Sequence, residues 1–220
     1  MKLTLLNILL CSSAAIGAIT VVGVNDADQE AYNAQLLTSD LLGTVAFSGT
    51  ALTGGTANAL NDDAVGATDS TANAAWTGGN GGSVFTYDLD VTVNTDGYDI
   101  TEIQSIAAWS GAGFGNQAWS VEYSTVGSAT YSTLETVNYL FPAGGAGASK
   151  VNITDPDDNV LASGVDSLRF TSNVVAGALF NGAFVWRELD ATGTPTVVPE
   201  PTSFSLLALG ALSALSRRKR

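Results

Sequence analysis

Short stretches of alternating apolar and polar residues fill the middle of the chain. Every second side chain of a β-strand points to the same face, so this alternation predicts strands with one buried face. No long stretch with the 3.6-residue periodicity of an amphipathic helix interrupts them. The clearest examples place Phe85, Tyr87, Leu89 and Val91, then Trp119, Val121 and Tyr123, and then Leu168 and Phe170 on one face each.

Glycine-rich segments separate the expected strands. Four of them lie at Thr53–Thr56, Gly78–Gly82, Gly111–Gly115 and Gly144–Gly147. Many short strands joined by Gly-rich turns are typical of an antiparallel sandwich or barrel, so the body is predicted to be all-β. Further strands are expected near residues 45–48, 103–108, 134–139, 150–153 and 184–189.

The first 18 residues have the form of a secretory signal peptide. Lys2 precedes an apolar run from Leu3 to Leu10, and Ala15-Ile16-Gly17 fits the small-x-small cleavage rule. A lipoprotein signal with Cys11 as the modified residue is the alternative, although such signals have a small residue before the cysteine, where this chain has a leucine. We therefore expect a signal helix at residues 1–18 and a folded body at residues 19–197.

The last 23 residues form a separate segment of three parts. Pro199-Glu200-Pro201 comes first, the apolar stretch Ser203–Ser216 follows, and Arg217, Arg218, Lys219 and Arg220 end the chain. A helix of this apolar stretch would be about 21 Å long, short of the ~30 Å hydrocarbon core of a bilayer. The basic end would stay at the cytoplasmic face. Residues 198–220 are therefore expected to hold the chain in the membrane transiently, with an ordinary tail anchor as the alternative.

This order of three parts resembles the PEP-CTERM sorting signal of Gram-negative bacteria. The resemblance implies that a membrane enzyme, exosortase, recognises and processes the tail. It also implies that the protein is exported, passes through the inner membrane, and reaches the cell surface or the extracellular polysaccharide matrix.

Composition and charge exclude several classes of function. The chain carries 8 Lys and Arg against 21 Asp and Glu, a formal net charge of −13, and five of the eight cations lie at the two ends. Nucleic-acid binding needs clustered Lys and Arg, so no nucleic-acid partner is expected. The chain contains no His and one Cys, which excludes Ser-His-Asp and Cys-His catalysis and the usual zinc sites.

The order of motifs in the body resembles that of discoidin-like, galactose-binding-like domains. The loop Leu60-Asn61-Asp62-Asp63 precedes Thr68, Thr71 and Trp76, although Asp63 stands where this family usually carries Gly. The later segments that resemble strands of the family are residues 85–90, 98–103, 119–124, 165–170 and 184–189. The resemblance implies an antiparallel jelly-roll β-sandwich, and a laminin-G-like sandwich is the alternative.

Several carboxylates of the body are candidate metal ligands. Asp62, Asp63 and Asp69 supply oxygen atoms within one loop region. The family resemblance implies a structural Ca²⁺ at this loop, closed by an acidic residue on the last strand, and Glu188 stands there. Calcium prefers six to eight oxygen ligands, many of them backbone carbonyls. An Asx-rich turn without metal is the alternative.

Aromatic residues beside the Gly-rich loops are candidate sugar contacts. Trp76 and Phe114 neighbour such loops, and Asn116 adds an amide beside the second ring. An exposed ring stacks on a sugar face while amides bind hydroxyl groups, so these three residues are the expected ligand-binding residues. Packing within the loops is the alternative for each ring.

Together these features predict an exported, non-catalytic protein of the cell surface or matrix that binds carbohydrate, including exopolysaccharide. A purely structural matrix component is the first alternative. The second is a glycosidase that uses two carboxylates, although none of the acidic residues is marked out by aromatic and basic neighbours.

Overall fold

The computed structural model describes residues 19–26, 32, 34–43, 45–49, 54–55, 57–67, 69, 71–72, 74–76, 81–109, 114–140, 147–157, 159–175 and 182–198. The expected signal helix and the expected C-terminal hydrophobic helix lie outside these residues. Within the described part, no helix is both long and apolar enough to cross a membrane. Antiparallel strands build the fold there, and the 3₁₀ turn η2 spans Ala57–Leu60.

One layer, here called sheet A, is built around the central strand β10. Its neighbours on the two sides are β5 and β7, and all pairs are antiparallel. The order across this layer is β8 (Ser132–Tyr139), β7 (Gln117–Thr125), β10 (Ala162–Ser172), β5 (Val84–Asp88) and β2 (Phe47–Gly49).

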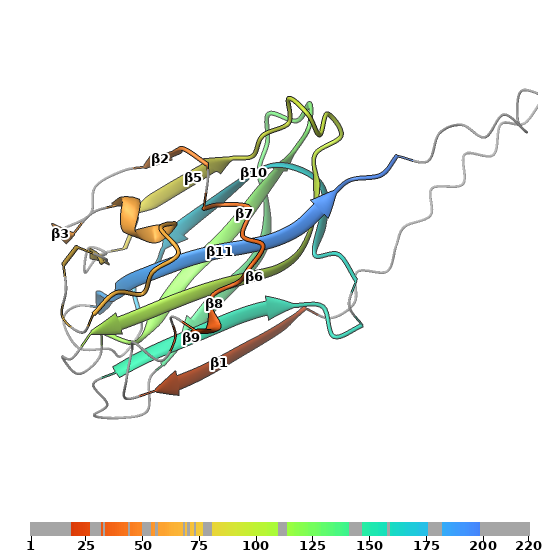
Figure 1. The fold of residues 1–220 in the computed structure, drawn as a ribbon. Coiled ribbons are helices and arrows are strands. Elements are labelled where there is room, and N and C mark those ends of the chain that lie inside the picture. The colour runs from red at the N-terminus through yellow and green to blue at the C-terminus, as the bar shows by residue number, and fades with distance from the viewer. Residues whose placement is uncertain are drawn as a thin grey trace, which may run out of the picture.

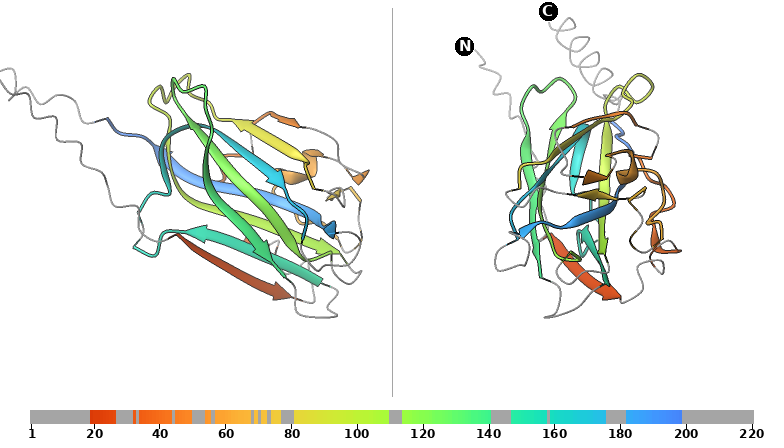
Figure 2. Two further views of the ribbon diagram at one scale, coloured as in Figure 1. Left: turned by 180° about the vertical axis from the view of Figure 1, so that it is seen from behind. Right: turned by 90° about the vertical axis from the view of Figure 1, so that its left-hand side faces the viewer.

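The second layer, sheet B, packs against sheet A (Figures 1 and 2). The layers join where the start of β10 pairs briefly with β6, at Ala162 and Val165. The order across sheet B is β1 (Thr20–Asp26), β9 (Gly147–Thr154), β6 (Tyr98–Trp109), β11 (Val185–Pro195), β4 (Ala75–Trp76) and β3 (Gly54–Gly55). The prediction of an antiparallel β-sandwich is therefore confirmed.

The core lies between the layers and contains most of the side chains that the alternation placed on one face, although Val91 lies in the turn after β5 and is only partly buried. Phe85, Trp119 and Phe170 are fully buried. Edge-to-face ring contacts cross from sheet A to sheet B, and the ring centres of Phe85 and Trp186 are 5.9 Å apart. Such pairs add to the stabilisation that comes from burying the rings.

Buried polar groups also join the two layers. The Gln117 side chain of sheet A accepts a hydrogen bond from the Ser105 hydroxyl (2.7 Å) and donates one to the Ser149 hydroxyl (2.8 Å) in sheet B. The indole N–H of Trp119 donates to the same Gln117 oxygen, and that of Trp186 donates to Ser105. These bonds give hydrogen-bond partners to the buried polar groups of Gln117, Ser105 and the two indoles.

The sandwich has two ends with different structural roles. We call one of them the tail end, because β1 begins there and β11 finishes there (Figure 1). The turns 89–97, 126–131, 155–157 and 159–161 lie at the same end. At the opposite end, the loop end, β6 and β10 finish and β11 begins. Strand β1 was not predicted, because its residues directly follow the signal-like segment; it completes sheet B by pairing with β9 over seven residues.

Candidate functional site

Four carboxylates from three distant segments meet on sheet B, and we call them the carboxylate cluster. They belong to Asp40 before β2, Asp63 after η2, and Glu188 and Asp190 in β11. Oxygen atoms of Asp40, Asp63 and Asp190 lie within 4.8 Å of one another. A Glu188 oxygen accepts a hydrogen bond from the Ala64 amide at 3.1 Å, which holds the Asp63 loop against β11.

Hydrogen bonds to backbone groups, both within the first segment and across to β11, hold the cluster in place. One oxygen of Asp40 accepts bonds from the amides of Leu42 (3.0 Å) and Ala191 (2.8 Å), so the first segment is fastened to β11. Asn61 donates its side-chain amide to the carbonyl groups of Leu42 and Val45. These contacts bring chain segments together that are about 150 residues apart.

Burial raises the pKa values of three carboxylates in the cluster. Desolvation, with repulsion from Asp40, raises the pKa of Asp190 to about 8. Desolvation, with repulsion from Asp190, raises the pKa of Glu188 to about 10. The pKa of Asp40 is also raised, mainly by burial. Ionised carboxylates at this place therefore require a compensating positive charge.

The oxygen atoms of the cluster fit a hard cation. Within the described part of the chain, one buried oxygen each of Asp40, Glu188 and Asp190 has no hydrogen-bond partner. Gly43 leaves room beside them, since a Cβ at this residue would lie 3.2 Å from Asp40 Oδ2 and 3.4 Å from Asp63 Oδ2. Carboxylate oxygens in such number are the ligands that Ca²⁺ prefers.

A hollow of about 460 Å³ opens at the cluster. Asp40 and Asp63 line both the hollow and the cluster, so the carboxylates are reached from solvent on this side. The rest of the lining comes from the segment before Asp40, namely Ala34, Leu36, Leu37, Thr38 and Ser39.

The structure separates the four predicted metal ligands. Asp63 and Glu188 belong to the cluster, whereas Asp62 is exposed and its oxygen accepts a bond from the Ala64 amide (3.1 Å) at the periphery. Asp69 is placed apart, and its charge acts on the Arg187 guanidinium instead. Sequence reasoning missed Asp190, although it stands two residues after Glu188 and thus faces the same side of the strand.

Asp40 was missed for a different reason. It lies 22 residues before Asp62 in a segment without a recognisable motif. Long-range hydrogen bonds between this segment and β11, such as the one from the Ala191 amide to Asp40, bring it to the cluster.

Two predicted sugar-contacting residues are buried. Phe114 is 8% exposed and packs with Ala74, Ala183 and Val185, and Asn116 is 5% exposed. The expectation that they form an exposed platform is therefore wrong, because the residues next to a Gly-rich loop turn inward to close the loop end. The backbone of Trp76 pairs with Val185 in β4, and the side chain of Trp76 lies outside the described part of the structure.

An aromatic residue that the sequence did not single out lies at the same end. Trp109, half-buried, is the last residue of β6 and packs against the Phe114 cluster. The guanidinium carbon of Arg187 lies 5.1 Å from the centre of its ring, and the Arg187 Nε donates to the Ala108 carbonyl at 3.0 Å. Desolvation lowers the pKa of Arg187 to about 10.

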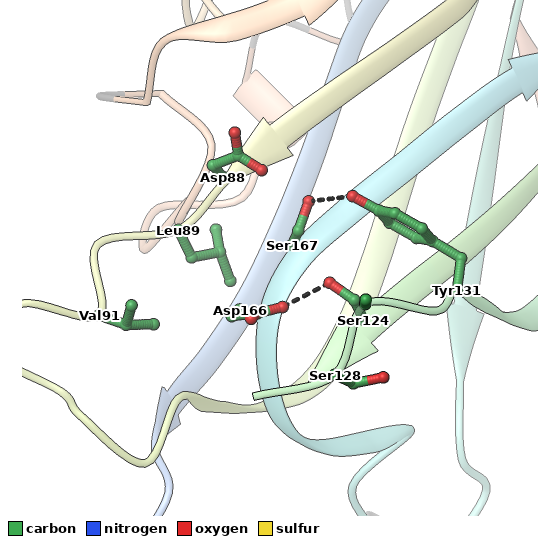
Figure 3. A pocket seen from close by; sticks show the side chains of 9 residues that line it. Asp88, Leu89, Val91, Ser124, Ser128, Tyr131, Asp166 and Ser167 are labelled. Carbon is green, nitrogen blue, oxygen red and sulfur yellow. Dashed lines mark hydrogen bonds between the residues drawn. The ribbon is translucent and has the colours of Figure 1, made fainter. Parts of the chain in front are cut away.

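A second hollow, of about 300 Å³, lies at the tail end (Figure 3). Leu89 and Val91 line one side of it and Tyr131 the other. The Ser124 hydroxyl donates to Asp166, and the hydroxyl groups of Tyr131 and Ser167 are hydrogen-bonded at 2.8 Å. Asp88, Ser128 and Ala129 complete the lining.

The sorting residues of the tail, Pro199, Glu200 and Pro201 with Arg217, Arg218, Lys219 and Arg220, lie outside the described residues. Residues 197–220 match the PEP-CTERM protein-sorting motif. The predicted resemblance of the tail is therefore confirmed, and the motif indicates export and sorting to the cell surface. No curated protein matches the chain as a whole.

The body has the fold of a solved lectin structure, and two solved carbohydrate-binding modules are similar to it at lower TM-scores. A fucolectin from striped bass (Morone saxatilis) serum is 12% identical over 70% of this chain and 48% of its own, with a TM-score of 0.51. CpGH89CBM32-5 from Clostridium perfringens, in complex with GalNAc-β-1,3-galactose, is 15% identical over 70% of this chain and 99% of its own (TM-score 0.45). The family 32 carbohydrate-binding module of C. perfringens NanJ, in complex with galactose, is 11% identical over 70% and 97% (TM-score 0.47).

Proposed function

We propose that this chain is an exported, non-catalytic protein of the cell surface or extracellular matrix whose β-sandwich binds carbohydrate. The observation that carries the proposal is the combination of a sorting motif at residues 197–220 with a sandwich of the fold found in a fucolectin. The absence of histidine and the burial of Glu188 and Asp190 also favour binding over hydrolysis, since a two-carboxylate glycosidase needs both groups at its substrate.

The two ends of the chain serve export in this proposal. Residues 1–18 direct secretion and are removed, and residues 198–220 hold the protein in the inner membrane until an exosortase-type enzyme processes the tail. The host is then a Gram-negative bacterium, and the body reaches the cell surface or the polysaccharide matrix outside it. Val197 and Val198, the first two residues of the matched segment, are exposed, which supports this proposal.

The carboxylate cluster is proposed to hold a structural Ca²⁺. Asp40, Asp63, Glu188 and Asp190 would supply its protein ligands, and the bound ion would neutralise charges that burial otherwise forces to take up protons. The ion would thereby fasten the segments before β2 and after η2 to β11. Its role is to order the loops beside the sandwich rather than to act on a substrate.

The loop end is the proposed carbohydrate surface. Trp109 offers a half-buried ring there, and the fully buried Arg187 guanidinium lies beside this ring and supports it from within. Rings that stack on a sugar face together with a few fixed polar groups are the usual elements of a sugar site. The strongly negative net charge favours neutral glycans over polyanionic ones.

Binding of the body, residues 19–198, to a glycan array and to the exopolysaccharide of the host tests the proposal. Trp109→Ala should weaken binding about tenfold, the effect of losing about 1.4 kcal/mol of stacking. Tyr131→Ala, which removes an aromatic ring at the opposite end, should leave the affinity unchanged. If the unaltered body binds no glycan on either panel, the carbohydrate role is lost and the structural matrix component remains.

A further inference from the structure

The last folded residue before the sorting motif is fixed at the tail end by several hydrogen bonds. The Thr196 amide donates to the Gly97 carbonyl at 2.9 Å, and its hydroxyl donates to Asp99 at 2.6 Å while it accepts from the Gly164 amide at 3.1 Å. Ser163 donates to the same oxygen of Asp99. We call this arrangement the Thr196 clamp.

Two glycines make the clamp close-fitting. Gly97 and Gly164 both have positive φ angles, of 81° and 69°, which L side chains rarely adopt. A Cβ on Gly97 would lie 2.6 Å from the Gly164 carbonyl carbon. The end of the turn 89–97 and the first residues of β10 therefore pack backbone to backbone, and Thr196 is hydrogen-bonded to both of them.

The clamp limits how far the sorting motif can move from the body. Pro199 is three residues beyond Thr196, so even an extended chain carries it only about 10 Å away. Ser203, where the apolar stretch begins, is seven residues beyond Thr196 and thus at most about 25 Å away. Anything that grips the motif while this stretch is in the membrane must therefore approach the tail end closely.

The surface of the tail end is acidic. Exposed carboxylates of Asp88, Asp96 and Asp157 lie on it, and hydrogen bonds from Thr92 keep the pKa of Asp90 below its ordinary value. The nearest cation among the described residues, Arg169, is paired with Glu122 at 2.8 Å and stacked on Tyr131. The hollow of Figure 3 opens on this surface between Asp88 and Tyr131.

We propose that the tail end is the docking surface for the membrane enzyme that processes the tail, and that the Thr196 clamp presents the motif to it. The inference rests on the proposed function, since it requires a tail that is processed. The enzyme would meet the acidic surface with basic side chains, because charge complementarity speeds and orients such encounters. Because the chain between Thr196 and the motif is short, an enzyme that contacts the motif also contacts this surface.

Processing of the full-length chain in its own host tests the inference. The ratio of tail-bearing to processed chain is followed by intact-mass spectrometry after synthesis is stopped. Thr196→Val, which removes two bonds of the clamp, and Asp88→Lys, which reverses a charge on the surface, should each slow processing about tenfold. Their controls are Thr194→Val, an exposed position of the same strand, and Glu135→Lys on β8, both processed at the unaltered rate.

The outcomes separate the inference from the proposed function. If the unaltered chain keeps its tail, tail processing itself is wrong, and the docking surface is lost with it. If the tail is removed but Thr196→Val and Asp88→Lys are processed as fast as their controls, only the docking surface is wrong. If Asp88→Lys does not melt at the same temperature as the unaltered protein, Asp157→Lys, in another turn of the same surface, replaces it. Processing of Asp157→Lys at the control rate would then overturn the inference.

Discussion

At the scale of residues, the carboxylate cluster places acidic groups where burial raises their pKa values. Its members come from three segments that are far apart in sequence, and Asp40 and Asp190 belong to no motif that the sequence analysis recognised. Three of them keep a buried oxygen without a hydrogen-bond partner within the described part of the chain, namely Asp40, Glu188 and Asp190. Such atoms are costly unless a proton or a cation occupies the place beside them.

Substitution of single carboxylates distinguishes the ligands of the proposed ion from carboxylates that lie outside the site. Saturating Ca²⁺ should raise the melting temperature of the unaltered body by about 5–10 °C when the ion is 100-fold above its Kd. Asp63→Asn should abolish most of this rise, whereas Asp69→Asn should retain it, because Asp69 lies near Arg187 and outside the cluster. Calorimetry with calcium and with chelator measures both, and identical melting in the two conditions for the unaltered body would remove the site.

The same cluster predicts how stability depends on pH. Because the folded pKa values of Asp190 (about 8) and Glu188 (about 10) exceed their unfolded values near 4, the folded state binds more protons in this window. In the presence of chelator, the contribution of these two groups to the free energy of unfolding should therefore be greatest below about pH 4. It should fall as the pH rises through 8. Saturating Ca²⁺ should flatten this fall. Melting temperatures measured between pH 5 and 9 provide the check, and a flat profile in chelator would contradict it.

At the scale of elements, the edge strands β1 and β8 close one side of the sandwich. The Tyr139 ring of β8 lies over Gly23 of β1, where a Cβ would come within 2.1 Å of a ring carbon. The contact joins the edges of sheet A and sheet B, and among the strands that the structure describes β1 and β8 share no hydrogen-bonded pairing. A glycine is required because only a bare backbone leaves room for the ring.

Replacing this glycine should open the edge contact. Gly23→Val must displace Tyr139 and should lower the free energy of unfolding by about 1–3 kcal/mol. Val22→Thr, at a half-exposed neighbouring position of β1, should change it by less than about 0.5 kcal/mol. Urea unfolding of both variants gives the comparison. Equal stability of Gly23→Val and the unaltered body would show that the contact contributes nothing.

At the scale of the whole molecule, the distribution of charge matches the proposed route of export. Between the two ends the chain has three basic residues, Lys150, Arg169 and Arg187. Native material should therefore lack both residues 1–18 and the basic cluster Arg217–Arg220, and should be more acidic than the full chain. Its intact mass measures this directly, and a mass that includes the last four residues contradicts tail processing.

The strands and the sorting tail were determined by the sequence itself. Alternation placed Phe85, Trp119 and Phe170 on buried faces, because a strand has a period of two wherever it lies. The tail motif is contiguous and needs no fold to be recognised. Strand β1 escaped prediction because it directly follows the signal-like segment and because Val21, Val22 and Gly23 do not alternate between apolar and polar residues.

The sites were decided by tertiary structure. The hydrogen bond from the Ala191 amide brings Asp40 to Asp190, and Phe114 turns inward to fill the loop end. Thr196 is fastened by residues of β10 and β6 that are about 30 and 100 residues away in sequence. The local sequence pattern predicts none of these contacts, because it indicates which face of a strand a side chain lies on and not which distant segment packs against that face. Burial and charge then act on the groups that the fold has gathered, and for this reason the chemistry of the body appears only once the sheets are packed.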